Sequence, residues 1–304
     1  MAPVLDVAAS PTAASPKLYW SVHGFTDADS RIDRADLDGT GVETIVGSGL
    51  RAPWDLEMDA AGGKLYWGDV SAHNLQRCNL DGTGVEMLLD GPPSTIDDPG
   101  GVAFDPLAND LYWTDLALDR VNRLDLDTGI NHILLSVPST TFVGIALDPG
   151  AGLMYWADAS TDTIRKANLD GTNMDVVLAG LSNPRDIELD LASGHMYVAN
   201  LGGGIYRANL DGGDLTLLAS GQFGGGANCL TLDLARRAVY WTESANGHVS
   251  RINLDGTGYQ PDLIEPVGGI GRGVAVIPEP ATLALLVTFT VGAISRRRRR
   301  SCSQ

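Results

Sequence analysis

The sequence predicts an all-β protein, a six-bladed β-propeller of four-stranded blades, and three observations lead to this fold class. An aromatic element of the type Leu-Tyr-Trp recurs six times, at separations of 47, 46, 43, 42 and 43 residues. A Leu-Asp element with a nearby glycine follows each copy, and an alternating run ending in an acidic residue precedes most of them. A period near 43 residues with room for four short strands is typical of a propeller blade.

Each repeat is interpreted as four strands in a fixed order. The alternating run, such as 101–105, is the first strand, and the aromatic run is the second because aromatic and branched residues favour a pleated surface. The segment ending in Asn-Leu-Asp is the third, and a run such as 85–89 is the fourth. The Asp-Gly pair between them predicts a tight hairpin turn. A calcium loop would need further oxygen ligands and a glutamate at its twelfth position, which these copies lack.

The two ends of the repeat region predict how the ring closes. The first repeat has an aromatic strand at 18–20 but no convincing alternating strand before it. An unpaired alternating run remains at 273–277. Closing the ring removes exposed sheet edges. We therefore expect the strand at 273–277 to pair beside Tyr19 and complete the first blade.

These elements resemble the YWTD propeller, the class B repeat of the low-density lipoprotein receptor family, over about residues 17–277. In that family the aromatic strand and its aspartate are scaffold, and the faces of the ring bind other proteins. The resemblance therefore implies a structural role for Tyr19, Trp20, Tyr66, Trp67, Asp69, Tyr112, Trp113, Asp115, Tyr155, Trp156, Asp158, Tyr197, Tyr240 and Trp241.

Four positions depart from the family pattern: Ser21, Val198, Asn200 and Glu243. Two of them lie in the fifth repeat, so we expect that blade to pack less regularly. The receptor versions also carry neighbouring disulfide-bonded modules, which do not occur in this sequence. A receptor-type ligand is therefore not transferred.

Charge and cysteine content exclude several classes of function. The net charge is −17, and residues 1–277 alone carry −21, with 37 acidic and 16 basic residues. Such a surface repels nucleic acid and anionic lipid, so neither is expected as a partner of the ring. Cys78 and Cys229 lie at different repeat positions and are expected to be buried without a disulfide. No paired-cysteine motif indicates a zinc or redox site.

The end of the chain is a different kind of sequence. Pro278, Glu279 and Pro280 precede an uncharged, mostly apolar stretch at 281–294, and a run of arginines follows. A helix of 14 residues spans about 21 Å, and flanking residues bring it near the roughly 30 Å of a bilayer core. We predict a short transmembrane helix with the arginines on the cytoplasmic side. A plain C-terminal anchor is one interpretation of this segment.

The order of these elements resembles the PEP-CTERM sorting signal of bacteria. The resemblance implies recognition by an exosortase-like sorting protease at 278–300, membrane attachment before processing, and a final location outside the cytoplasm. Residues 301–304 form a tail. Residues 1–16 lack a basic start and an apolar run, so either the true start lies upstream or export uses another route. The sorting-signal residues are Pro278, Glu279, Pro280, Arg296, Arg297, Arg298, Arg299 and Arg300.

No recognisable catalytic set occurs in the sequence. The histidines, at 23, 73, 132, 195 and 248, fall at different repeat positions without metal-ligand spacing. There is no nucleophile elbow and no phosphate-binding glycine loop. We therefore predict no catalytic residue, metal or cofactor.

The positions just before each first strand break the repeat. Several copies have glycine there, and six residues are large, polar or charged exceptions. In a propeller these positions lie near the mouth of the central channel, and Asp55 and Asp186, three blades apart, should face each other. The predicted ligand-binding residues are Trp54, Asp55, Arg185, Asp186, Asn228 and Arg272.

Three hypotheses about function remain open. The first is an exported propeller that binds a protein or polysaccharide at the cell surface or in a biofilm matrix. The second is a lactonase- or lyase-like enzyme with a site at the channel mouth. The third is a rigid spacer without a ligand. For the mouth residues, the alternative is that the arginine and aspartate at 185–186 pair with neighbours while the tryptophan packs between blades.

Overall fold

The computed structural model describes residues 15–277 apart from 93–94, 221–225 and 266–268. The predicted sorting signal and transmembrane helix, at 278–300, and most of the N-terminal segment lie outside the described residues. Those expectations therefore stay predictions. Among the residues that the structure describes, no helix has the length and apolar character needed to span a membrane.

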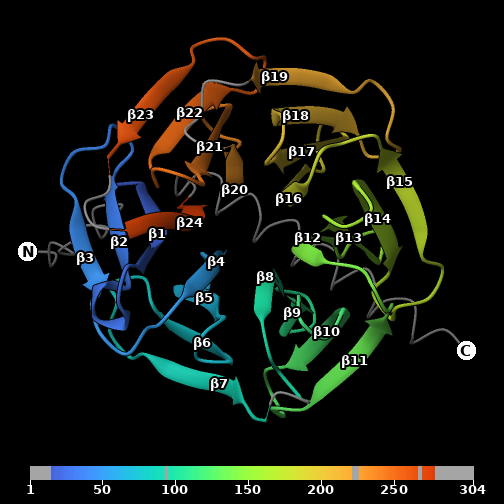
Figure 1. Cartoon of the computed structure of the whole chain (residues 1–304), viewed down its shortest axis with the longest axis horizontal. Helices are drawn as coiled ribbons and strands as arrows, with labels where there is room; N and C mark the ends of the chain where they lie inside the picture. The colour runs from blue at the N-terminus through green and yellow to red at the C-terminus, as the bar shows by residue number, and fades with distance from the viewer. Residues whose placement is uncertain (1–14, 93–94, 221–225, 266–268, 278–304) are drawn as a thin grey trace, which may run out of the picture.

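The described chain forms six four-stranded antiparallel sheets arranged as the blades of a propeller (Figure 1). From the centre outward, blade 1 contains β24 (Gly269–Val276), β1 (Lys17–Gly24), β2 (Arg31–Asp36) and β3 (Glu43–Val46). Blade 2 contains β4 (Pro53–Asp59), β5 (Lys64–Asp69), β6 (Asn74–Asn79) and β7 (Glu86–Asp90). Blade 3 contains β8 (Pro99–Asp105), β9 (Asp110–Asp115), β10 (Arg120–Asp125) and β11 (Asn131–Ser136).

The remaining three blades repeat the same order. Blade 4 contains β12 (Phe142–Asp148), β13 (Leu153–Asp158), β14 (Thr163–Asn168) and β15 (Asp175–Ala179). Blade 5 contains β16 (Pro184–Asp190), β17 (His195–Asn200), β18 (Gly204–Asn209) and β19 (Thr216–Ser220). Blade 6 contains β20 (Ala227–Asp233), β21 (Ala238–Glu243), β22 (Val249–Asn253) and β23 (Gln260–Ile264). A short 3-10 helix, η1 (Asp27–Asp29), lies between β1 and β2.

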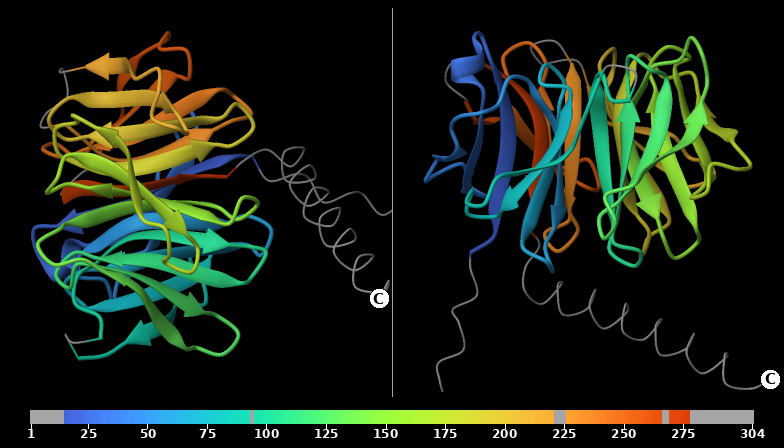
Figure 2. Two further views of the ribbon diagram at one scale, coloured as in Figure 1. Left: turned by 90° about the vertical axis from the view of Figure 1, so that its right-hand side faces the viewer. Right: turned by 90° about the horizontal axis from the view of Figure 1, so that it is seen from below.

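The ring closes as the sequence predicts. Strand β24, from the end of the described chain, pairs antiparallel with β1, and Tyr19 lies opposite Ala275. The backbone N–H of Ile277 donates to the carbonyl of Lys17 at 2.9 Å, so the two ends of the described propeller leave the same face (Figure 2). Strand β24 begins earlier than the run at 273–277 that predicted it. Its extra residues continue the pairing as far as Gly24.

The aromatic second strands supply the core between blades. Trp20, Trp67, Trp113, Trp156 and Trp241 are all fully buried. Each such side chain buries on the order of 200 Å², which stabilises the fold by roughly 5 kcal/mol before conformational entropy is subtracted. The core clusters join neighbouring blades, as where Tyr19 of blade 1 packs with Leu65 and Trp67 of blade 2.

The fifth blade is as regular as the others in its strand order and pairing. Val198 replaces the tryptophan and is fully buried, packed with Ile187, Met196 and Ala208. A branched apolar side chain therefore fills this position, and the expected loss of regularity is not seen.

The Asp-Gly turns connect the third and fourth strands, as the sequence predicts. In the first copy the Asp38 carboxylate accepts the N–H of Thr40 at 3.0 Å and its hydroxyl at 2.6 Å. Gly39 has φ of 82°, and a Cβ there would lie 2.3 Å from the carbonyl oxygen of Leu263 in the neighbouring blade. Glycine is needed here both for the left-handed backbone and for the close approach of two blades.

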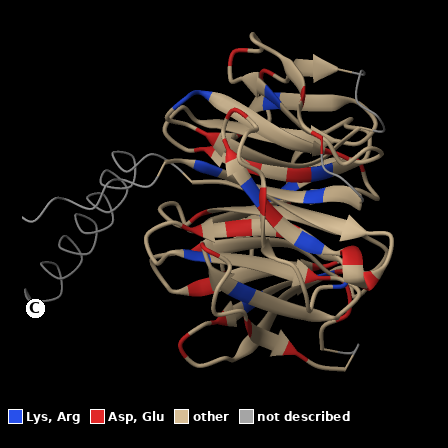
Figure 3. Cartoon of the chain, turned by 90° about the vertical axis from the view of Figure 1, so that its left-hand side faces the viewer, with Lys and Arg blue, Asp and Glu red and all other residues tan. Residues whose placement is uncertain are grey.

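Acidic residues occur on many strands and loops of the ring, as Figure 3 shows for one side. Two faces can be distinguished. We call the face where the six inner strands begin the mouth face, and the face where they end, beside Lys17 and Ile277, the termini face. The predicted ligand-binding residues belong to the mouth face.

Candidate functional site at the channel mouth

The six inner strands, β4, β8, β12, β16, β20 and β24, surround the central channel (Figure 1). Pairing with the second strand is irregular at the start of several of them. In β4, for example, the register shifts between Pro53 and Leu56, and in β16 between Pro184 and Asp186. Such β-bulges re-aim side chains. The residues inside these irregularities include Trp54, Asp55 and Arg185.

In three blades a hydroxyl group on the second strand links the inner strand to the next blade. Ser21 accepts the N–H of Gly273 at 2.7 Å and donates to the carbonyl of Trp54 at 2.6 Å. The hydroxyl of Thr114 joins the Gly101 N–H to the Val143 carbonyl in the same way. We call these contacts hydroxyl links.

The third hydroxyl link is made by Thr242, which joins the N–H of Cys229 to the carbonyl of Arg272. The position occupied by these hydroxyl residues lies at the end of the aromatic element of each repeat. The sequence element therefore contributes a contact that holds the ring together at its centre.

Blades 2 and 5 have Gly68 and Ala199 at this position, and a carboxylate makes the link instead. Asp55 accepts the N–H of Leu56 at 2.9 Å and, across the blade boundary, that of Val102 at 3.1 Å. Asp186 accepts the N–H groups of Ile187 and Leu230, both at 2.8 Å. Both side chains are buried.

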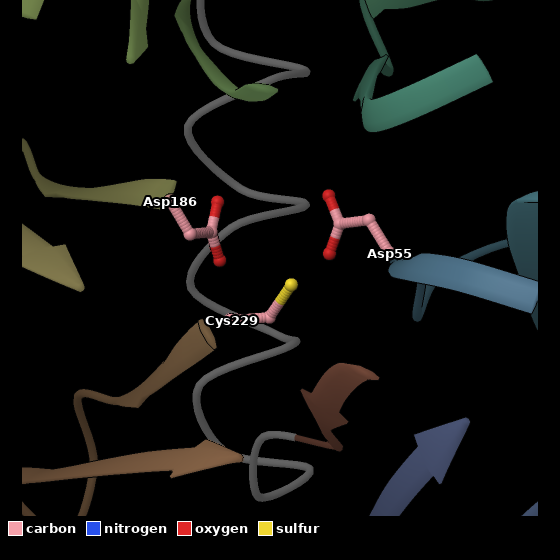
Figure 4. Close-up of side chains that lie close together, drawn as sticks. All are labelled: Asp55, Asp186 and Cys229. Carbon is pink, nitrogen blue, oxygen red and sulfur yellow. The ribbon is translucent and has the colours of Figure 1, made fainter. Parts of the chain in front are cut away.

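Asp55 and Asp186 face each other across the channel, as predicted, and Cys229 lies beside them (Figure 4). One carboxylate oxygen from each aspartate and the Cys229 sulfur lie within 4.8 Å of one another. Burial raises the pKa of Asp55 to about 7 and the pKa of Asp186 well above its usual value, and the Asp55 charge acts further on Asp186. Burial also raises the pKa of the Cys229 thiol. The two aspartates therefore hold protons more readily than exposed carboxyls do.

Two glutamates form a second acidic level toward the termini face. Glu57 and Glu188 lie two residues beyond the aspartates and so point to the same side of their strands. Both line a hollow of about 230 Å³ whose other walls are largely apolar. Burial raises the pKa of Glu57 to about 8 and that of Glu188 well above its usual value. Glu57 also accepts the N–H of Phe104 at 3.1 Å.

Sequence reasoning missed both glutamates and the position of Cys229. A signal was present, because the equivalent position is alanine in three other blades, at 103, 146 and 275. Glycine at 144 shows how tight the channel is at the aspartate level. A Cβ there would lie 2.1 Å from a carboxylate oxygen of Asp186.

At the mouth itself, two arginines from other blades lie near the ring of Trp54. The guanidinium carbon of Arg272 lies 4.4 Å from the centre of its ring, and that of Arg185 lies 5.5 Å away. All three side chains are half-buried. Burial lowers the pKa of both arginines, and the Arg185 charge further lowers the pKa of Arg272. Guanidinium–indole contacts of this kind stabilise both groups.

The structure separates the six predicted site residues into two sets. Trp54, Arg185 and Arg272 lie together at the mouth with access to solvent. The two aspartates lie just inside the channel and bind backbone. Asn228 is buried, and its amide donates to the Arg272 carbonyl at 3.4 Å, so its side chain supports the inner strand.

The acidic residues of the aromatic element bind the loop that leads into the inner strand. Asp69 accepts the N–H groups of Arg51 and Ala52 at 2.8 and 2.9 Å. Asp115 accepts the N–H of Asp97 at 2.9 Å, and Asp158 accepts that of Thr141 at 3.4 Å. Through these contacts the three aspartates fix where β4, β8 and β12 start.

Two histidine-containing groups lie elsewhere on the mouth face and could not be seen from spacing. His73 approaches the Asp97 carboxylate at 3.2 Å, with Asp98 nearby. The imidazole of His248 contacts Asp262, and Glu243 is adjacent. Glu243 already accepts the Ser250 hydroxyl and the Asn246 amide. These groups and the Asp55–Asp186–Cys229 group are the sets of metal-ligand type within the described ranges.

Comparisons with known proteins agree with the propeller architecture. Residues 152–191 match the model of the low-density lipoprotein receptor repeat class B. A chain from the crystal structure of a nidogen/laminin complex has a TM-score of 0.76 at 21% identity, covering 86% of this chain and 98% of that chain. The described chain is therefore a six-bladed propeller in which the segment 152–191 matches the class B repeat.

Two enzymes also have similar structures. A gluconolactonase from Xanthomonas campestris has a TM-score of 0.60 at 18% identity, covering 73% of this chain and 79% of that one. A streptogramin B lyase has a TM-score of 0.60 at 15% identity, covering 87% and 88%. At these identities the likeness shows the fold alone.

Proposed function

We propose that this chain is an exported bacterial protein of the cell surface or biofilm matrix, and that its propeller binds a protein or polysaccharide at the channel mouth without catalysing a reaction. The observation that carries the proposal is the mouth cluster. Trp54 and the two arginines beside it are half-buried, and neither arginine forms an ion pair within the described residues. Aromatic and arginine side chains in a partly desolvated pocket are typical of binding hot spots.

Export is supported by sequence alone. The segment 278–300 has the order of a PEP-CTERM signal, which implies an exosortase-like protease as a partner and membrane attachment before cleavage. Mass spectrometry of the mature protein from a host with such a protease tests this. A mature chain ending near Pro280 supports sorting, whereas a chain that still ends at Gln304 leaves the plain anchor as the interpretation.

The binding proposal is tested by replacing Trp54 and Arg185 with alanine together. Retention of the purified protein would be measured on immobilised polysaccharide and protein fractions of the producer's extracellular matrix. We expect the double variant to lose most of its retention, at least tenfold, while its thermal unfolding shows that it is folded. Retention equal to that of the unchanged protein would remove the mouth from the binding site.

The alternative is a propeller enzyme of lactonase or lyase type with its site at the mouth. The buried group of Asp55, Asp186 and Cys229 and the two enzyme neighbours favour it. Against it, the carboxylate oxygens of both aspartates already accept backbone N–H groups. In each aspartate one oxygen binds its own inner strand and the other binds the inner strand of the next blade. Metal analysis of the purified protein and a lactone hydrolysis screen separate the two. One tightly bound divalent metal per chain with lactone turnover would establish the enzyme.

A further inference from the structure

Three N–H donors at the channel mouth lack an acceptor. The indole Nε1 of Trp54 and the Nε atoms of Arg185 and Arg272 are buried and have no hydrogen-bond partner in the described part of the chain. The three residues come from three blades, and both guanidinium groups lie within 5.5 Å of the centre of one ring. A buried donor without an acceptor destabilises the folded protein, because it has lost its hydrogen bond to water. An acceptor from outside the chain would relieve this.

The same point carries unbalanced positive charge. Within the described ranges, no carboxylate forms an ion pair with either arginine, although Asp186 directly follows Arg185 in the chain. The carboxylate of Asp186 is turned into the channel, where it accepts the N–H groups of Ile187 and Leu230. In a body with a formal charge of −21, two unpaired guanidinium groups form a local positive site. Such a site attracts an oxyanion.

The chemistry of the donors indicates which group they would bind. Guanidinium and indole groups only donate hydrogen bonds, whereas an ionised carboxylate only accepts them, and its two oxygens match the guanidinium fork. A peptide backbone would also bring N–H groups that need acceptors. The carbonyls of Trp54, Val143 and Arg272 at the mouth already accept hydroxyl groups.

A sugar fits these conditions better than a peptide. Its hydroxyl groups rotate to donate or to accept, and the half-buried indole of Trp54 supplies apolar surface for its ring. The acidic surface of the propeller repels a densely charged chain. The ligand should therefore carry its carboxylates singly, among neutral sugars or at a chain end.

We propose that Trp54, Arg185 and Arg272 bind the carboxylate of a sugar acid, such as a uronate unit of a polysaccharide. This inference rests on the proposed binding function and narrows its ligand class. The two guanidinium groups hold the carboxylate, and the indole N–H and ring lie beside the sugar.

The test uses the full chain and isothermal titration calorimetry with three small probes: glucuronate, glucose and acetate. We expect glucuronate to bind, glucose not to bind, and acetate to bind at least tenfold more weakly. The substitutions Arg185→Gln and Arg272→Gln should each weaken glucuronate binding at least tenfold. Arg251→Gln is the matched control, because Arg251 also lies over an aromatic ring, Tyr240, at 5.8 Å. It should leave glucuronate binding unchanged.

Several results would overturn the inference. Equal binding of acetate and glucuronate would reduce the site to a bare anion site, and tighter binding of a capped aspartate peptide would transfer it to a protein ligand. Glucuronate binding that survives both arginine substitutions would place the site elsewhere. The matrix-retention assay keeps the two proposals apart. If no probe binds but the Trp54–Arg185 double variant still loses retention, the binding function stands and the sugar-acid inference is wrong.

Discussion

The outer hairpins and the inner strands of this propeller are built from the same repeat but differ in how much they vary. In the outer hairpins, Asp38, Asp81, Asp170 and Asp255 all accept the N–H and hydroxyl of a threonine two residues later, at 2.6–3.0 Å. At the inner strands, three blades use hydroxyl links and two use buried aspartates. The residues that differ between blades, including the buried carboxyl groups, therefore lie on the inner strands rather than in the outer hairpins.

This contrast has a physical reason. An outer hairpin needs only to turn and to contact its neighbouring blade, and an acidic turn residue followed by glycine meets that need in most blades. An inner strand also forms the channel wall, so its side chains meet those of strands more than a hundred residues away. Blades 2 and 5 place Asp55, Glu57, Asp186 and Glu188 there, and burial raises the pKa of all four carboxyl groups.

The largest expected effect comes from the two channel glutamates, Glu57 and Glu188. The raised pKa values mean that the folded protein holds protons on Glu57 and Glu188 that the unfolded chain releases above about pH 4.5. Stability should therefore fall as the pH rises from 5 to about 8. Glu57→Gln combined with Glu188→Gln should raise the free energy of unfolding by roughly 5 kcal/mol or more at pH 9 and leave it nearly unchanged at pH 4.

Urea unfolding at both pH values measures this effect, with the exposed Glu265→Gln as the control. The Glu57→Gln side chain keeps an oxygen that can accept the N–H of Phe104, so packing is preserved. An equal free energy of unfolding for the unchanged protein at pH 5 and pH 9 would show that ionising these channel carboxyl groups does not destabilise the fold.

A smaller, pH-independent effect is expected from a hydroxyl link. Ser21→Ala leaves the N–H of Gly273 and the carbonyl of Trp54 unpaired in a buried position. The free energy of unfolding should fall by about 2 kcal/mol at every pH, because no titrating group is removed. Denaturant unfolding compares it with the exposed Ser48→Ala. A loss below about 0.5 kcal/mol would show that solvent replaces the link.

The smallest effect belongs to the outer hairpins. Asp170→Ala removes the acceptor for the N–H and hydroxyl of Thr172, contacts that also lower the pKa of Asp170. The melting temperature should fall by about 1–2 °C. Asp81→Ala should behave alike, since its contacts are the same. Addition of calcium or EDTA should change neither value, and a calcium-dependent rise would support the calcium-loop interpretation of these turns.

The architecture could be predicted from the sequence because the same pattern of strands and turns recurs six times. The period, the aromatic strands, the Asp-Gly turns and the unpaired strand near 273–277 together predict six blades and the closure beside Tyr19. The site was only partly predictable. Trp54 and Arg185 stand out because other copies have smaller residues at or near these positions.

The sequence does not show which side chains of different blades lie close together. The grouping of Asp55 with Asp186 followed from counting blades, but Cys229 beside them depends on the width of the channel. Glu57 and Glu188 occur within a run that alternates like any strand, so their convergence is visible only in three dimensions. The histidine groups likewise join separate segments: His73 meets Asp97 and Asp98 from the loop before β8, and His248 meets Asp262 of β23.

The pairing of β1 with β24 has a consequence for how the chain acquires its fold during synthesis. Strand β1 is made well before its partner at the channel, because the strands of five other blades lie between them in the chain. Contacts between such distant segments form slowly. Until then the nascent chain exposes an unpaired strand edge beside Leu18, which is prone to aggregation. The ring therefore stays open until β24 has been made and can pair with β1.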